Sequence, residues 1–409
     1  MKKLVVLLCV VITLLLAGCS RNTESTETTA PSQSDASTPH VLQVPPEDRN
    51  QAFLCQSFVE TPEGYYFGVD RSAETFIYFC PRGEAAFYPL CGKPNCAHND
   101  RNCNAFAGRV FGYYDGALYG AEMGFTQIDV VKMNLDGTDH QKLTSLDISN
   151  AVNNGGFFYV FHHGKLYVWT TPMDENDKSI LTVLNLSDCS RMDHTLESAI
   201  WYYSNFCGDK LYGIKNLSLS PEEREAWQAN PNAGYEREMG EVDAAAGTER
   251  TVASCQSPGF LSAYYTDSTM YAYKWEGGDS NGIDPKKLQA GFLEIDLNSG
   301  AVKECGTPVD DIYWIACDED YIYAHSFFRR EDGSCTEDDE EGVQYTLYLL
   351  SRDYQLVDQI ELASNIGIVV VTSDRIFFNQ NYGETISYYL DKAQIGSHEL
   401  KLLPVETIR

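Results

Sequence analysis

The residues best suited to carry chemistry in this sequence form a short cluster of cysteines and one histidine. Cys91, Cys96, His98 and Cys103 follow the pattern C-x4-C-x-H-x4-C within 13 residues. Thiolates and imidazole are ligands that Zn²⁺ prefers, and four protein ligands make a closed, structural site. The spacing therefore predicts a tetrahedral Cys3His zinc site, with the nearby Cys80 as an alternative ligand.

The start of the chain has the organisation of an export signal. Two lysines precede an apolar run from Leu4 to Leu16, and Leu16-Ala17-Gly18-Cys19 ends the segment. A cationic start, an apolar stretch and small residues before a cleavage point are typical of such signals. The last four residues resemble the lipobox of bacterial lipoproteins, whose cysteine receives a diacylglyceryl group after cleavage just before it. The resemblance implies a signal peptide over residues 1–18 and a lipid anchor at Cys19 on the extracellular face of the cell membrane.

The segment after Cys19 has the composition of a linker. Residues 19–46 are rich in Ser, Thr, Glu, Pro and Gln, with almost nothing apolar before Val41. Such a segment cannot bury enough apolar surface to offset the entropy lost on ordering. We expect a disordered tether over residues 19–46 and a folded domain over residues 47–409.

Disulfide bonds are the competing interpretation of the cysteine cluster, because an exported chain meets oxidising conditions. The sequence has 13 cysteines, and 11 remain once Cys9 of the signal and Cys19 of the anchor are set aside. If the three cluster cysteines bind metal, an even number remains to pair. The cluster also resembles a Cys-Pro-x-Cys-x-His segment of uncharacterised lipoproteins of gut clostridia. Metal, disulfides and unpaired thiols all stay open at this point.

Internal repeats indicate the fold. A turn followed by alternating apolar and aromatic residues recurs seven times, about 45 to 60 residues apart. The copies are Glu63–Phe67, Asp115–Tyr119, His163–Tyr167, Gly208–Tyr212, Asp267–Tyr271, Asp320–Tyr323 and Ser373–Phe377. A second hairpin follows each copy, at 76–90, 130–143, 181–196, 239–252, 292–305, 346–360 and 386–403. Four short antiparallel strands per repeat predict an all-β β-propeller of seven four-stranded blades, with six blades and a capping hairpin as the alternative.

One repeat also carries a family resemblance. The segment Val131–Thr138 resembles the blade motif of TolB-like and YWTD-type propellers. The resemblance implies propeller geometry and assigns no binding residue.

Catalytic motifs in the sequence lack the context that they need. Gly278–Gly282 fits a nucleophile-elbow pattern, but it lies in a polar loop rather than between a strand and a helix. The acidic run Glu337–Glu341 lacks the alternating ligand spacing of a calcium loop. His162 and His163 adjoin the turn residue Gly164, which favours a surface or strand-end pair over a ligand pair.

Charge and anchor together indicate the kind of function. The net charge is −29, which argues against nucleic acid as a partner. We expect a non-enzymatic module that binds a peptide, a glycan or a partner protein outside the cell. A propeller glycan hydrolase or lyase with carboxylates in the central funnel, and a structural surface scaffold, are the alternatives.

Overall fold

The structure, a computed structural model, divides into two units, residues 1–41 and residues 42–409. All described residues belong to the second unit. They are 58–71, 74–149, 155–172, 179–196, 201–215, 222, 225, 235–257, 259–265, 268–276, 289–306, 308–309, 312–328, 344–363, 366–380 and 385–408. The predicted signal peptide, Cys19 and the tether lie outside these residues. Within the described part of the chain, no helix has the length and apolar character needed to cross a membrane.

Five sheets of the second unit have the same plan, with four antiparallel strands in chain order. They are β10 (Gly155–His162), β11 (Lys165–Pro172), β12 (Ser179–Asn185) and β13 (Arg191–Leu196); β14 (Trp201–Cys207), β15 (Lys210–Lys215), β16 (Tyr235–Asp243) and β17 (Thr248–Ser257); β18 (Gly259–Tyr265), β19 (Thr269–Glu276), β20 (Gln289–Asp296) and β21 (Val302–Cys305); β22 (Ile312–Cys317), β23 (Tyr321–Phe328), β24 (Gln344–Ser351) and β25 (Leu356–Leu362); β26 (Ile366–Val371), β27 (Arg375–Gln380), β28 (Ile386–Asp391) and β29 (Leu403–Pro404).

The remaining strands form one ten-stranded sheet. They are β1 (Phe58–Glu60), β2 (Gly64–Arg71), β3 (Glu74–Pro81), β4 (Ala86–Pro89), β5 (Phe106–Gly108), β6 (Val110–Tyr114), β7 (Ala117–Met123), β8 (Gln127–Met133), β9 (Gln141–Asp147) and β30 (Glu406–Thr407). β1 to β4 pair in sequence, as do β6 to β9. The short β5 joins the two sets, since it pairs with β3 on one side and β7 on the other.

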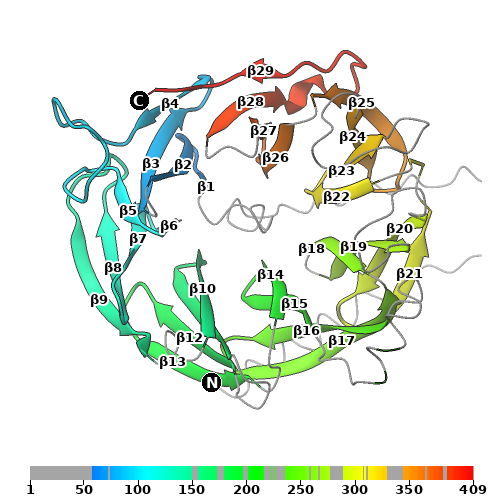
Figure 1. Cartoon of the computed structure of the whole chain (residues 1–409), viewed down its shortest axis with the longest axis horizontal. Helices are drawn as coiled ribbons and strands as arrows, with labels where there is room; N and C mark the ends of the chain where they lie inside the picture. Colours follow the sequence, from blue (N-terminus) through cyan, green and yellow to red (C-terminus); the bar gives the residue numbers. More distant parts are fainter. Residues whose placement is uncertain are drawn as a thin grey trace, which may run out of the picture. The chain divides into compact units, whose positions relative to one another are not determined.

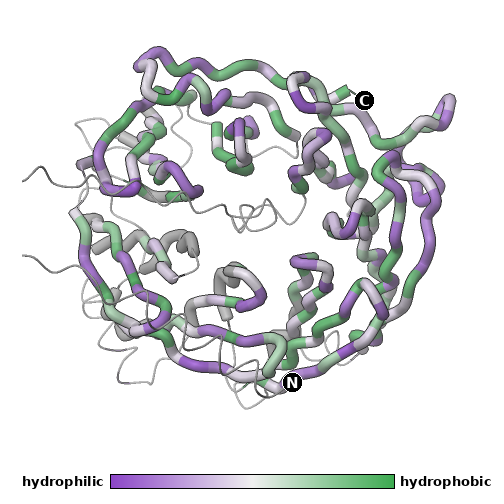
Figure 2. Tube along the Cα trace, turned by 180° about the vertical axis from the view of Figure 1, so that it is seen from behind, coloured by the Kyte–Doolittle hydropathy of each residue, from purple (hydrophilic) through white to green (hydrophobic). Residues whose placement is uncertain are grey.

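The burial of the strands follows their order within each sheet. The second strands β7 and β27 are almost wholly buried, whereas the fourth strands β9 and β13 are mostly exposed. Figure 2 shows hydrophilic and hydrophobic residues interspersed along the strands. Half-exposed strands alternate in this way because successive side chains point to opposite faces. The middle strands therefore pack against neighbouring sheets, and the fourth strands face solvent.

The sheets of this unit follow one another around a ring, with the first strands β6, β10, β14, β18, β22 and β26 on its inner side (Figure 1). Contacts join β6 with β10, β14 with β18, and β18 with β22. Apolar clusters extend from each sheet into the next; one contains Leu146 of β9, Leu166 of β11 and Leu184 of β12. Such radial packing of small antiparallel sheets is that of a β-propeller. The predicted all-β propeller is confirmed at this level.

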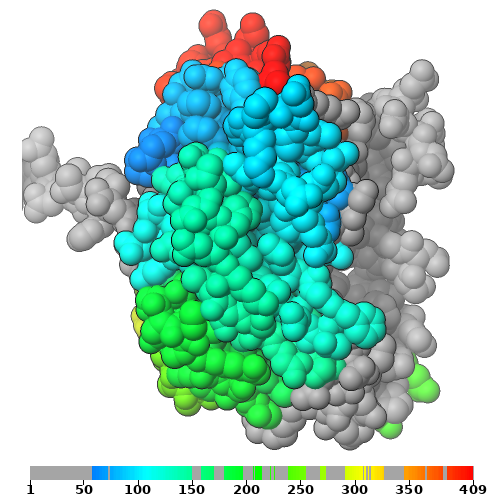
Figure 3. All heavy atoms as spheres, turned by 90° about the vertical axis from the view of Figure 1, so that its left-hand side faces the viewer, coloured from blue at the N-terminus to red at the C-terminus, as the bar shows by residue number. Residues whose placement is uncertain are grey.

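The ring closes where the two ends of the unit meet. β30 pairs in parallel with β4, with Glu406 opposite Ala86 and Thr407 opposite Phe87. Phe377 of β27 packs in the same apolar cluster as Phe58 of β1. Figure 3 accordingly shows the red C-terminal residues against the blue strands of the ten-stranded sheet.

The prediction of seven separate blades is wrong as stated. The structure has five four-stranded sheets, and the first two predicted repeats share the ten-stranded sheet. Two glycines allow this merging. A Cβ on Gly108 would lie 2.2 Å from the Ala121 carbonyl oxygen, and one on Gly120 would lie 2.5 Å from the Ala107 oxygen. Without side chains at these positions, the backbones of β5 and β7 approach closely enough to join the sheets.

Candidate metal centre

The cysteine cluster lies in the loop that leaves β4 and returns to β5, and one residue of β3 holds both ends of this loop. The Leu90 N–H donates to the Ile77 carbonyl at 2.9 Å, and the Ile77 N–H donates to the Ala105 carbonyl at 2.7 Å. Leu90 and Ala105 are both buried. The intervening residues therefore leave and re-enter the fold at the same point.

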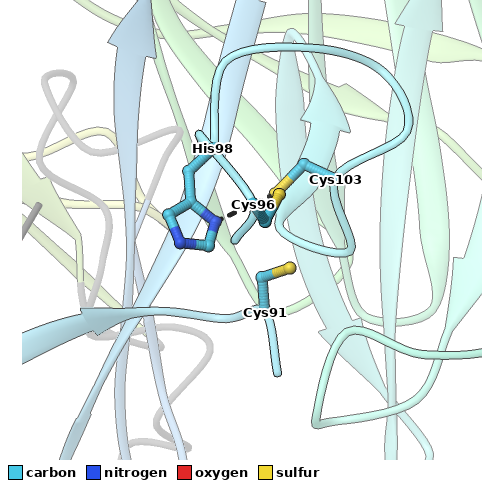
Figure 4. A group of neighbouring side chains, drawn as sticks. All are labelled: Cys91, Cys96, His98 and Cys103. Carbon is cyan, nitrogen blue, oxygen red and sulfur yellow. Dashed lines mark hydrogen bonds between the residues drawn. The ribbon is translucent and has the colours of Figure 1, made fainter. Parts of the chain in front are cut away.

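The four predicted ligands converge within this loop (Figure 4). The sulfur atoms of Cys91, Cys96 and Cys103 and a ring nitrogen of His98 all lie within 4.8 Å of one another. Nδ1 of His98 is 3.4 Å from Sγ of Cys103. Ligand atoms around a tetrahedral zinc ion are separated by about 3.5–3.8 Å, given Zn–S and Zn–N bonds of about 2.3 and 2.0 Å. The four donors therefore surround a volume that fits one such ion after small side-chain movements.

Tight turns bring the donors together. Asn95 and His98 both have left-handed backbone, with φ of 61° and 51°. Such a conformation costs a residue with a side chain about 1–2 kcal/mol. The Cys103 N–H donates to the Asp100 carbonyl at 3.0 Å, which forms a further turn before the last ligand. The loop thus adopts an unfavourable backbone at the histidine whose ring joins the cluster.

Surrounding residues hold the loop from two sides. Arg71 of β2 donates from Nη1 to the His98 carbonyl at 3.1 Å. On the other side, the turn between β8 and β9 lies against the two ends of the loop. A Cβ on Gly137 (φ 75°) would lie 2.4 Å from the Leu90 carbonyl oxygen, so only glycine fits there. Nε2 of His140 is 3.1 Å from the Asn104 carbonyl oxygen.

The thiols of the cluster differ in acidity. Burial would raise the pKa of Cys91, but hydrogen bonds from the backbone at Lys93 and Asn104 and from the thiols of Cys103 and Cys96 hold it below its ordinary value. Burial, with the neighbouring Cys96 and Cys91, raises the pKa of Cys103 to about 12. The thiol of Cys91 is therefore more acidic than that of Cys103.

The alternative ligand Cys80 is not part of the cluster. It is buried in β3, and its sulfur contacts the carbonyl oxygens of Pro81 and Glu84 at 3.6 and 3.5 Å. The structure has no disulfide bond at the three cluster cysteines or at Cys80, Cys189, Cys305 and Cys317. The structure thus brings together the four residues first predicted as ligands, and Cys80 lies outside their cluster.

The other motifs have structural surroundings or lie elsewhere. His162 is buried at the end of β10, where its ring stacks between those of His163 and Phe206. Its Nε2 is 2.7 Å from the Gly208 carbonyl oxygen, so it joins neighbouring sheets rather than forming a surface pair. Gly278–Gly282 and Glu337–Glu341 lie outside the described residues.

Sequence reasoning missed a polar cluster at the ring closure. Glu60 is buried, and it accepts hydrogen bonds from the Ser373 N–H at 3.1 Å and from Nη2 of Arg82 at 2.8 Å. Tyr65 donates to Asp374 at 2.5 Å, and Arg375 donates to the Glu84 carbonyl. Apart from Glu60 and Arg82, which are 22 positions apart, these partners are about 300 residues apart in sequence, so no local signal reveals them.

Comparisons with known proteins concern the fold. No protein-family model and no curated protein matches the chain. The tricorn protease structure matches with a TM-score of 0.50 and 9% identity over 85% of this chain and 35% of that chain, so this chain spans about a third of its length. The β-propeller domain of the Trilobed protease from Pyrococcus furiosus has a TM-score of 0.37 and 12% identity, over 58% of this chain and 70% of that one. TolB from Acinetobacter baumannii has a TM-score of 0.35 and 9% identity, over 75% and 65%. With the strand arrangement described above, the chain is a β-propeller protein.

Proposed function

We propose that the chain is a propeller interaction module, tethered by a lipid at Cys19 to the extracellular face of the cell membrane. In this proposal residues 1–18 direct export, residues 19–46 form the tether, and the propeller binds a peptide, a glycan or a partner protein without catalysing a reaction. The residues around Cys19 support the anchor. The propeller supports the binding role, because a rigid scaffold presents loops and strand edges in fixed positions.

A stacked aromatic pair with one exposed ring carries the binding part of this proposal. Phe158 of β10 is 41% exposed. Its ring stacks on that of Trp169 in β11, with centroids 5.7 Å apart and planes inclined by 25°. Trp169 is 7% exposed, so it is fixed by its surroundings and holds the Phe158 ring in place. The pair thus offers a preorganised apolar surface on an inner strand of the ring.

A fixed aromatic face of this kind suits a limited range of ligands. A sugar ring, a proline or an aromatic side chain can stack on it, and such pairs contribute about 0.5–1.5 kcal/mol beyond the burial of area. Because the surface is ordered before binding, little side-chain entropy is lost on association. Loss of the Phe158 ring should therefore lower the affinity for such a ligand by about 3- to 10-fold.

The test is a binding screen with a matched control. Mature protein is applied to an oligosaccharide array and to a displayed peptide library, and the affinity of each hit is measured for Phe158→Ala and Phe125→Ala. Phe125 is 88% exposed in the β7–β8 turn, so it controls for the loss of an exposed phenylalanine. A hit weakened only by Phe158→Ala supports the proposal. Absence of any reproducible hit, or equal weakening by both variants, contradicts it.

We also infer that the ten-stranded sheet is two merged blades. β1–β4 and β6–β9 each repeat the four-stranded antiparallel plan of the other five sheets. An experimental structure in which β5 leaves either neighbour, or in which one of these sets has no four-stranded pairing, would contradict the inference.

A further inference from the structure

We infer that Cys91, Cys96, His98 and Cys103 bind one Zn²⁺ ion, and that this ion stabilises the attachment of the C-terminal strand to the propeller. This inference does not depend on the peptide, glycan or protein binding proposed above. The cysteine cluster follows the C-terminal end of β4, whereas the aromatic pair lies on β10 and β11. It follows from the donor set, from the sparse packing of the loop and from the connection of the loop to β4.

The donor set favours a metal over a disulfide. A disulfide would join two of the three sulfurs, and the third thiol and the imidazole would not take part in the bond. Here all four groups converge within 4.8 Å, and a tetrahedral ion uses every one of them. Three sulfurs and one nitrogen suit Zn²⁺, and because the protein supplies four ligands, no position is left for water or substrate. The site is therefore structural.

Apart from the hydrogen bonds described above, the loop has little buried surface to keep it ordered. Gly92 to Asn95 and Asn99 to Asn102 are exposed, whereas Cys103 is 2% exposed. Exposed backbone with little apolar burial is easily opened by local fluctuation. A bound ion would supply the missing cross-link, because metal affinity in such a loop adds directly to its folding free energy.

The loop is continuous with the strand that receives the C-terminus. Cys91 follows β4 after a single residue, and its N–H donates to the Pro89 carbonyl at 2.7 Å. The Ile408 N–H donates to the Phe87 carbonyl of β4 at 2.8 Å, and the Glu406 N–H donates to the carbonyl of Ala85, just before β4, at 3.0 Å. β4 pairs with β3 at only two register positions. Fixing its end through Cys91 therefore stabilises the edge on which β30 lies, by linkage.

Metal content is measured first, on mature protein exported by its native route. We expect about one equivalent of zinc, free thiols at the three cluster cysteines, and loss of most of the metal in Cys103→Ser and His98→Ala. Cys189→Ser is the matched control, since Cys189 is a partly exposed free thiol outside the cluster. Replacing the zinc of the wild-type protein with Co²⁺ should give the visible absorption of a tetrahedral thiolate site. This measurement does not depend on whether the variants fold. Metal-free protein with oxidised Cys91, Cys96 or Cys103 would overturn the site.

Hydrogen exchange tests the link to the C-terminus. Chelation should increase exchange at least fivefold at the amides of Cys103 and Ile408, and leave that of Leu166 in β11 unchanged. Restoring zinc should reverse the effect. If zinc is bound and chelation accelerates exchange at Cys103 but not at Ile408, the coupling to β30 is wrong.

Discussion

Replacement of Glu241 by glutamine tests whether hydrogen-bonded carboxylates between strands hold this propeller together. Glu241 of β16 is 4% exposed, and it lies opposite Tyr212 of β15 and Arg250 of β17 in the strand register. It accepts hydrogen bonds from Tyr212 at 2.8 Å and from Nη2 of Arg250 at 2.6 Å, and Lys210 is 2.9 Å away. The same Arg250 nitrogen donates to the Leu297 carbonyl of the next sheet. One carboxylate thus organises contacts within a sheet and toward its neighbour.

The size of the effect follows from the acidity of this group. Burial alone would raise the pKa of Glu241, but hydrogen bonds from Arg250, Lys210 and Tyr212 lower it from 4.5 to about 2. At about 1.36 kcal/mol per pKa unit, this corresponds to about 3 kcal/mol of stability at pH 7. The side chains of Lys210 and Arg250 are 44% and 42% exposed, so solvent screens part of this. We expect Glu241→Gln to lower the free energy of unfolding by about 2–3 kcal/mol.

The pH dependence has a definite sign. Because the pKa is lower in the folded state, the stabilisation is complete above about pH 4.5 and is lost as the pH falls toward 2. Urea unfolding of wild type and Glu241→Gln, measured from about pH 7 to pH 3, should show a difference that shrinks by about two thirds. Glu361→Gln, at an exposed position of β25, should change stability little at either pH. A loss for Glu241→Gln that is equal at pH 7 and pH 3, or below about 0.5 kcal/mol at pH 7, would refute the reasoning.

Three further predictions concern the last two sheets, the ring closure and the anchor. Lys392→Met removes the buried partner of Asp318, 2.6 Å away, and should lower the free energy of unfolding by about 3–5 kcal/mol. The double variant with Asp318→Asn should recover part of this loss, and a double variant no more stable than Lys392→Met contradicts the pairing. Deletion of residues 403–409 should expose the edge of β4 and cause aggregation, so a monodisperse, cooperatively melting product by size exclusion and calorimetry would count against closure by β30. Cys19→Ala should abolish labelling with palmitate in cells, and undiminished labelling would exclude the lipid anchor.

Local patterns in the sequence were enough to predict the strands and their turns. The repeat copy His163–Tyr167 contains the turn before β11 and the first residues of that strand, Lys165 to Tyr167. In the predicted turn after β8, Gly137 has a φ of 75°, and the carboxylate of Asp136 accepts the Thr138 N–H at 2.9 Å. The convergence of the cysteine cluster was likewise foreseeable, because its four residues lie within 13 positions of one another. In all these cases the interacting groups are close in sequence.

The features that the sequence did not reveal depend on distant partners. β5 has three residues, too few for an alternation, and it pairs because Gly108 and Gly120 permit close approach. Nothing near Glu60 indicates that it is buried against Ser373 rather than solvated. The position of His162 next to the turn residue Gly164 is typical of an exposed residue, yet the ring of Phe206 in the next sheet stacks on it. In each case the pairing or burial depends on residues distant in sequence, and the residue pattern within one strand does not indicate it.

The parallel pairing of β4 with β30 has a consequence for how the protein reaches its folded state. The paired residues Ala86 and Glu406 are about 320 positions apart, so this contact brings a large loss of chain entropy and forms late. During synthesis from the N-terminus, β4 is made long before Glu406, and one of its hydrogen-bonding edges stays unpaired until that residue is available. Closure of the ring should therefore be limited by this pairing, and chains in which it has not yet formed should be the ones that associate with each other.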